Sequence, residues 1–90
     1  MKTIADVKRE MTIGSVWHCM WRCREATKDM GNRPVSIVQT NRFAFKTIKA
    51  DGTITDSWCD WPKKSEVTFN SEKSFTIKQD DIELTYTKIS

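Results

Sequence analysis

The chain has 90 residues, of which 38% are hydrophobic and 30% are charged, and its formal net charge is +3. These values exclude a disordered chain, and no apolar run approaches the about 17–25 residues that a membrane-spanning helix needs. We therefore expect one soluble domain over residues 1–90. Asp6 stands where a secretory signal would be apolar, so the expected location is the cytoplasm.

Charge is distributed unevenly along the chain. Residues 1–50 hold ten Lys or Arg against four Asp or Glu, whereas residues 51–90 hold five against eight. A basic half beside an acidic half can attract an anionic partner, and it can equally be an ordinary solvated surface. Both interpretations stay open on the sequence.

A short amphipathic helix over residues 3–11 is the first predicted element. Thr3 is a suitable N-cap and is followed three residues later by an acid. Ile4, Val7 and Met11 then recur at helical spacing. Gly14 marks the end of this segment.

A half-buried strand is predicted over residues 16–25, because hydrophobic and polar residues alternate there. The apolar side carries Trp17, Cys19, Trp21 and Cys23. The opposite side carries Val16, His18, Met20, Arg22 and Arg24.

A loop is predicted over residues 26–34, where a turn-forming run surrounds Gly31. A long second strand then covers residues 35–47, with Ile37 and Phe45 on one face. We expect this strand to run without interruption into the next turn.

Asp51 and Gly52 are a strong hairpin signal and lead to a third strand over residues 53–61. A two-residue turn at this place puts Phe45 opposite Trp58 as an aromatic cross-strand pair. Pro62 ends the strand because it cannot donate a hydrogen bond to a neighbour.

Three more strands are predicted over residues 67–70, 74–79 and 82–89. Phe69 is expected opposite Phe75, and Ile77 opposite Ile82, which also sets Phe75 opposite Leu84. Both registers place the apolar residues on one face, which a slip of one residue would disrupt.

The predicted fold class is α+β, with a short N-terminal helix packed on a twisted five- to six-stranded antiparallel meander or partly open barrel. The helix covers part of the apolar face of the sheet. The expected core consists of Trp17, Trp21, Ile37, Phe43, Phe45, Trp58, Val67, Phe69, Phe75, Ile77, Ile82 and Leu84.

Metal binding and catalysis are not expected. Cys19 and Cys23 share a strand face but would lie about 13 Å apart at ~3.3 Å per residue, too far for one tetrahedral zinc ion. We expect reduced thiols, no metal and no cofactor. An enzyme would need Cys59 to reach His18 from another strand, and no other catalytic motif is present.

The predicted functional surface combines the even face of the first strand with a basic corner. Trp58 and Trp61 have opposite parity, so only one of them can face the core, and Trp61 lies beside Lys63 and Lys64. We therefore expect Trp61 to be exposed. The predicted binding residues are His18, Met20, Arg22, Arg24, Arg33, Trp61, Lys63 and Lys64.

Residues 33–41 (RPVSIVQTN), the Asp51–Gly52 pair and the run from Ser57 to Lys63 resemble small proteins encoded by bacteriophages and prophages. That resemblance implies an accessory or anti-defence protein acting in the host cytoplasm. Its implied function is to bind and inhibit a host or defence protein, without enzymatic activity.

Two alternatives of other classes remain. A nucleic-acid-binding module would place Arg22, Arg24, Lys28, Arg33 and Arg42 on phosphates, with Trp61 stacking on bases. A cysteine-dependent enzyme would use Cys59 and His18. A membrane partner is not expected, and a homodimer through an edge strand is a further alternative.

Overall fold

The computed structural model describes residues 1–23, 29–49, 58–79 and 81–89, and for residues 29–33 it describes the backbone alone. Its elements in chain order are α1 (Ile4–Glu10), β1 (Val16–Cys23), β2 (Asp29–Thr40), β3 (Ala44–Lys49), β4 (Cys59–Asp60), η1 (Lys64–Glu66), β5 (Val67–Ser71), β6 (Ser74–Gln79) and β7 (Ile82–Lys88).

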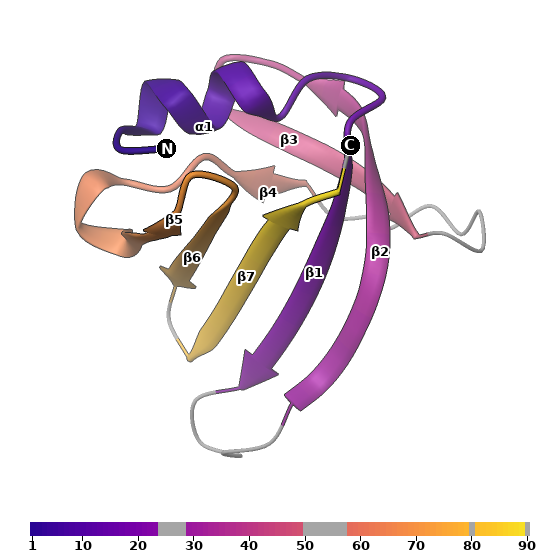
Figure 1. The fold of residues 1–90 in the computed structure, drawn as a ribbon, viewed down its shortest axis with the longest axis vertical. Coiled ribbons are helices and arrows are strands. Elements are labelled where there is room, and N and C mark those ends of the chain that lie inside the picture. Colours follow the sequence, from indigo (N-terminus) through magenta and orange to yellow (C-terminus); the bar gives the residue numbers. More distant parts are fainter. Residues whose placement is uncertain (24–28, 50–57, 80, 90) are drawn as a thin grey trace.

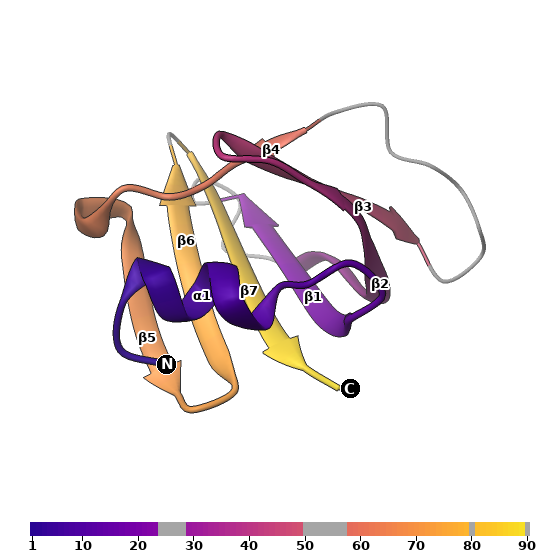
Figure 2. The same ribbon diagram turned by 90° about the horizontal axis from the view of Figure 1, so that it is seen from above.

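In the described part of the chain, the strands form one antiparallel sheet of seven strands in the order β4-β3-β2-β1-β7-β6-β5 (Figure 1). The broad α+β prediction is confirmed, but the sheet has seven strands instead of five to six. The sheet curls, so that β3 crosses the inner face of the strands around β7 (Figure 2). The rings of Phe45 on β3 and Tyr86 on β7 meet there, with centroids 5.8 Å apart.

Helix α1 begins as predicted, with Thr3 as its N-cap. The Asp6 backbone N–H donates to Thr3 Oγ1 (3.2 Å), and Asp6 Oδ2 accepts from the Thr3 backbone N–H (3.2 Å). Val7 and Met11 are fully buried, so the helix closes one end of the curled sheet. Gly14 follows with a φ of 93°, a conformation that favours glycine.

The core is an aromatic and aliphatic cluster enclosed by the curled sheet and α1. Tyr86 stacks on Phe75 at 5.5 Å, and Trp17 meets the edge of Phe75 at 5.7 Å. Such contacts add stabilisation beyond the area they bury. The buried cluster consists of Val7, Met11, Trp17, Val35, Ile37, Phe45, Phe75, Ile77 and Tyr86.

Strand β2 begins at Asp29, so the prediction of a loop over residues 26–34 is wrong for its second part. The backbone of Gly31 pairs with Trp21 on β1, and Pro34 pairs with His18. Pairing with β1 therefore overrides the local turn preference of this segment.

The predicted single strand over residues 35–47 is two strands joined by a turn. Asn41 Oδ1 accepts from the backbone N–H groups of Phe43 (2.8 Å) and Ala44 (2.9 Å). These two hydrogen bonds hold the turn, and the Asn41 backbone N–H donates to the Ala44 carbonyl oxygen across it (3.0 Å). Phe43 lies in the turn and is 70% exposed, so its assignment to the core is wrong.

The register between β3 and β4 differs from the prediction by one residue. Phe45 pairs with Cys59 and not with Trp58. A shift of one residue exchanges the two faces of a strand, and Trp58 is accordingly 40% exposed. The predicted Asp51–Gly52 turn lies outside the described residues.

For the last two hairpins, the observed pairing agrees better with the pairing predicted from the sequence. Phe69 pairs with Phe75 as predicted. Ile77 pairs with Leu84 instead of Ile82, and Phe75 pairs with Tyr86 instead of Leu84. This shift of two residues preserves the inward face but leaves Ile82 exposed, so Ile82 is not a core residue.

The remaining core predictions are met to different degrees. Val67, Phe69 and Leu84 are partly buried against the core cluster. Trp21 is half-buried and lies outside that cluster.

Candidate functional site

The outer face of β1 borders a groove of about 250 Å³ that extends across β7, β6 and β5. Two of the predicted binding residues, Met20 and Arg22, line this groove. Lys78 and Glu83 lie at the same end, with Lys78 Nζ and Glu83 Oε1 4.0 Å apart. The other lining residues are Thr68, Asn70, Thr76 and Thr85.

Hydroxyl and amide groups cross-link this outer face. Thr76 Oγ1 and Thr85 Oγ1 are 2.9 Å apart, and Asn70 Nδ2 donates to Thr76 Oγ1 (2.9 Å). The hydroxyl and amide groups of Asn70, Thr76 and Thr85 thus bind one another. Lys78 and Glu83 carry opposite charges and partly neutralise each other. The groove is therefore a polar surface with little concentrated charge. Among the other predicted residues, His18 is half-buried next to it along β1, Arg24 lies outside the described residues, and the Arg33 side chain is not described.

Trp61 is not the exposed aromatic that the sequence predicts. Its ring is partly buried against the core, 4.9 Å from that of Phe45, and its Nε1–H donates to the Asn41 carbonyl oxygen (2.7 Å). Lys8 Nζ lies over the same ring at 5.7 Å. Lys63 and Lys64 are exposed beyond buried Pro62. The lysines of the predicted basic corner are therefore exposed, whereas Trp61 packs against the core.

Among the described residues, two other aromatic side chains near β3 and β4 are exposed: Phe43, in the turn before β3, and Trp58, directly before β4. Phe43 lies under the guanidinium of Arg42, with Cζ 5.2 Å from the ring centroid. Trp58 lies under Lys46, with Nζ 5.9 Å from the ring centroid. We call these two ring–cation pairs, Arg42 with Phe43 and Lys46 with Trp58, the aromatic–cation surface. Each ring attracts its cation through the negative potential above its face.

Sequence reasoning missed this surface for two local reasons. The sequence pattern predicts a strand at Phe43 because it does not reveal the turn that Asn41 forms. Trp58 was assigned to the core because the β3–β4 register was off by one residue. Asn41 next to Arg42 was the available signal, since asparagine is a frequent turn former.

Inside the curled sheet, two thiols meet the hydroxyl of Tyr86. The thiols of Cys19 and Cys59 lie near the hydroxyl of Tyr86, whose side chain is buried. Burial, with the nearby Asp60 charge, raises the pKa of the Cys59 thiol to about 12. Burial also raises the pKa of Tyr86 well above its ordinary value. Cys59 is therefore a protonated thiol at neutral pH, not an activated nucleophile.

Catalysis by a Cys59–His18 pair finds no support in this geometry. His18 lies between Trp17 and Cys19 on β1, so its side chain points to the outer face. Cys59 packs against the core on the inner side. Two groups on opposite faces of a sheet cannot form the hydrogen bond that activates a thiol.

Within the described ranges, no cluster of three or more His, Cys, Asp or Glu side chains is arranged to hold a metal ion. None of the helices in the described part of the chain is long and apolar enough to cross a membrane. No protein-family model, curated protein or solved structure matches the chain.

Proposed function

We propose that the protein is a non-enzymatic binding module that holds a partner protein through the aromatic–cation surface. The observation that carries this proposal is the pairing of two exposed rings with cations, Phe43 with Arg42 and Trp58 with Lys46. Phe43 at 70% exposure leaves a large apolar area in water, which a partner can bury.

The residue types fit a protein interface. Aromatic residues and arginine are enriched at interfaces, and tryptophan and arginine dominate the binding energy of many of them. A cation held over a ring is ordered before binding, so less side-chain entropy is lost when it meets a carboxylate of the partner. The aromatic–cation surface thus combines an apolar anchor with a pre-positioned charge.

The resemblance to small phage-encoded accessory proteins supports a more specific version of this proposal. In that version the partner is a host or defence protein, and binding inhibits it in the host cytoplasm. A second copy of the chain is an alternative partner, since β4 and β5 are the two edges of the sheet.

Single-stranded nucleic acid is a second candidate partner, favoured by the exposure of Trp58 beside Lys46. Exposed aromatic rings stack on bases, and nearby cations contact phosphates. However, Lys46 and Arg42 already lie over ring faces that stacking bases would use. This arrangement favours a protein partner.

The test is a pull-down from host lysate with the wild-type protein and two variants, each with and without nuclease treatment. We expect Phe43→Ala to lose a partner that survives nuclease. Ile82→Ala, which removes a different exposed apolar side chain on β7, should retain that partner. Capture that disappears with nuclease supports the nucleic-acid candidate, and equal capture by both variants contradicts the proposed surface.

A further inference from the structure

A second concave region lies between α1, the turn joining β5 to β6, and the end of β7. It is a cavity of about 620 Å³, which is within the range of small-molecule sites. Lys2 and Arg9 line it from the helix side, Glu72 and Lys73 from the turn, and Lys88 from β7. This cavity is separate from the aromatic–cation surface.

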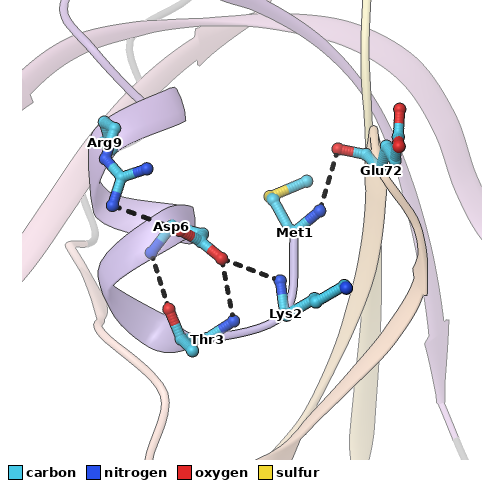
Figure 3. Close-up of polar contacts among 6 residues, drawn as sticks. All are labelled: Met1, Lys2, Thr3, Asp6, Arg9 and Glu72. Carbon is cyan, nitrogen blue, oxygen red and sulfur yellow. Dashed lines mark hydrogen bonds and ion pairs between the residues drawn. The ribbon is translucent and has the colours of Figure 1, made fainter.

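The walls of the cavity are joined by hydrogen bonds between distant segments. The Met1 nitrogen donates to the Glu72 carbonyl oxygen at 3.2 Å, which connects the start of the chain to the β5–β6 turn (Figure 3). The Lys88 backbone N–H donates to the Lys73 carbonyl oxygen at 2.8 Å, which connects that turn to β7. The charged side chains are therefore presented by segments that hold one another in place.

Two carboxylates of the cavity are already neutralised. Asp6 accepts the backbone N–H groups of Lys2 and Thr3 and forms an ion pair with Arg9 at 3.2 Å (Figure 3). Glu10 forms an ion pair with Lys88 at 2.6 Å. These contacts neutralise both carboxylates on the helix side, and Asp6 also binds the backbone N–H groups of Lys2 and Thr3, just before α1.

The charges that remain are mainly positive. Within the described part of the chain, neither Lys2 nor Lys73 has an ion-pair partner. Glu72 is the one lining carboxylate not engaged by a cation among the same residues. Arg9 is 71% exposed at its side chain and has further N–H groups beyond the one directed at Asp6. Apolar atoms of Met1 and Ile89 form part of the lining.

We propose that this cavity binds a small phosphate monoester that carries an organic group. Lys2 and Lys73 approach the phosphate from two sides, and charge-assisted hydrogen bonds to phosphate are stronger than neutral ones. Met1 and Ile89 contact the organic group. Recognition is assigned to the side chains, since the backbone N–H groups of Lys2 and Thr3 already donate to Asp6.

The test is a titration followed by backbone amide chemical shifts at low salt. The probes are adenosine monophosphate, adenosine and inorganic phosphate, each added to the whole protein. We expect the monophosphate to bind in the millimolar range or tighter and to shift amides of α1 and the β5–β6 turn. Adenosine should not bind, and inorganic phosphate should bind more weakly than the monophosphate.

Three variants complete the experiment. Lys2→Gln and Lys73→Gln should each weaken the monophosphate by about two- to fivefold, the weight of one exposed ion pair. Lys64→Gln, an exposed lysine at the other end of β5, should leave binding unchanged. Equal binding of adenosine, equal weakening by Lys64→Gln, or no saturable shift around the cavity would each overturn the proposal.

Discussion

Cys59 lies opposite Phe45 in the pairing of β3 with β4. This register turns Cys59 towards the core and Trp58 towards solvent, because alternate residues of a strand face opposite sides. Trp61, on the same side as Cys59, packs on Phe45. This single pairing thus decides which tryptophan packs on the core and which is exposed.

The two tryptophans should respond oppositely to truncation. Trp61→Ala removes a ring packed on Phe45 and a hydrogen bond to Asn41, so we expect a loss of about 3 kcal/mol in the free energy of unfolding. Trp58→Ala should cost about 1 kcal/mol or less. Urea denaturation of both variants measures this difference. The reverse order would contradict the β3–β4 register.

Phe75 should be among the most sensitive core positions. It is fully buried and contacts the rings of Trp17 and Tyr86. Phe75→Ala should lower the free energy of unfolding by about 3–5 kcal/mol. Phe43→Ala is the matched control, with an expected change within about 0.5 kcal/mol because that ring is exposed. A loss below about 1 kcal/mol for Phe75→Ala would place its ring outside the core.

The start of α1 can be tested through its cap. Thr3→Ala removes the acceptor for the Asp6 backbone N–H and should destabilise the protein by about 1 kcal/mol, whereas Thr3→Ser should retain most of this contribution.

Hydrogen bonds from backbone N–H groups, chiefly that of Lys2, lower the pKa of Asp6. Its contribution is therefore present above its unfolded pKa and lost as pH falls through the lower folded value. Thermal melts between neutral and acidic pH should show this loss in the wild type and a smaller one in Asp6→Asn.

The partly buried thiol of Cys59 predicts a loss of stability in alkali. The pKa of Cys59 rises from 9.0 to about 12, so the fold favours the neutral thiol. Its contribution is fully present below the unfolded pKa and is lost as pH rises towards 12. Denaturation midpoints should fall above pH 9 and fall less steeply in Cys59→Ala. Tyr86, whose pKa is also raised, contributes in the same direction. Rapid labelling of Cys59 by a thiol reagent at neutral pH in the folded protein would contradict its burial.

Local sequence signals predicted the elements whose partners are close in the chain. The cap at Thr3 and the spacing of Val7 and Met11 defined α1. The pairing of Phe69 with Phe75 was readable because a short turn joins their strands. In these segments local propensity and tertiary packing favour the same structure.

The errors arose where distant pairing or a side-chain hydrogen bond decides the outcome. Residues around Gly31 form a strand because β1 pairs with them, which local turn preference does not reveal. The turn at Asn41 depends on one amide oxygen that accepts from two backbone N–H groups. The register of β4 differs by one residue from the one that the sequence predicts, and this shift exchanges the sides expected for Trp58 and Trp61.

The candidate site was predictable only in part. Alternation along β1 correctly placed Met20 and Arg22 on the outer face, where they line the groove. Phe43 and Trp58 were not predicted as surface residues, because their exposure follows from the turn at Asn41 and the register at Cys59.

The most direct test of a protein-binding function is the affinity of the purified, nuclease-resistant partner for wild-type protein and for Phe43→Ala, measured by calorimetry. Phe43→Ala should weaken the complex by about 1–2 kcal/mol, roughly five- to thirtyfold, while its melting temperature stays close to that of the wild type. Arg22→Gln, in the groove on the outer face of β1, should leave the affinity unchanged. Unchanged affinity for Phe43→Ala together with a loss for Arg22→Gln would contradict the account and place the interface on the outer face of β1.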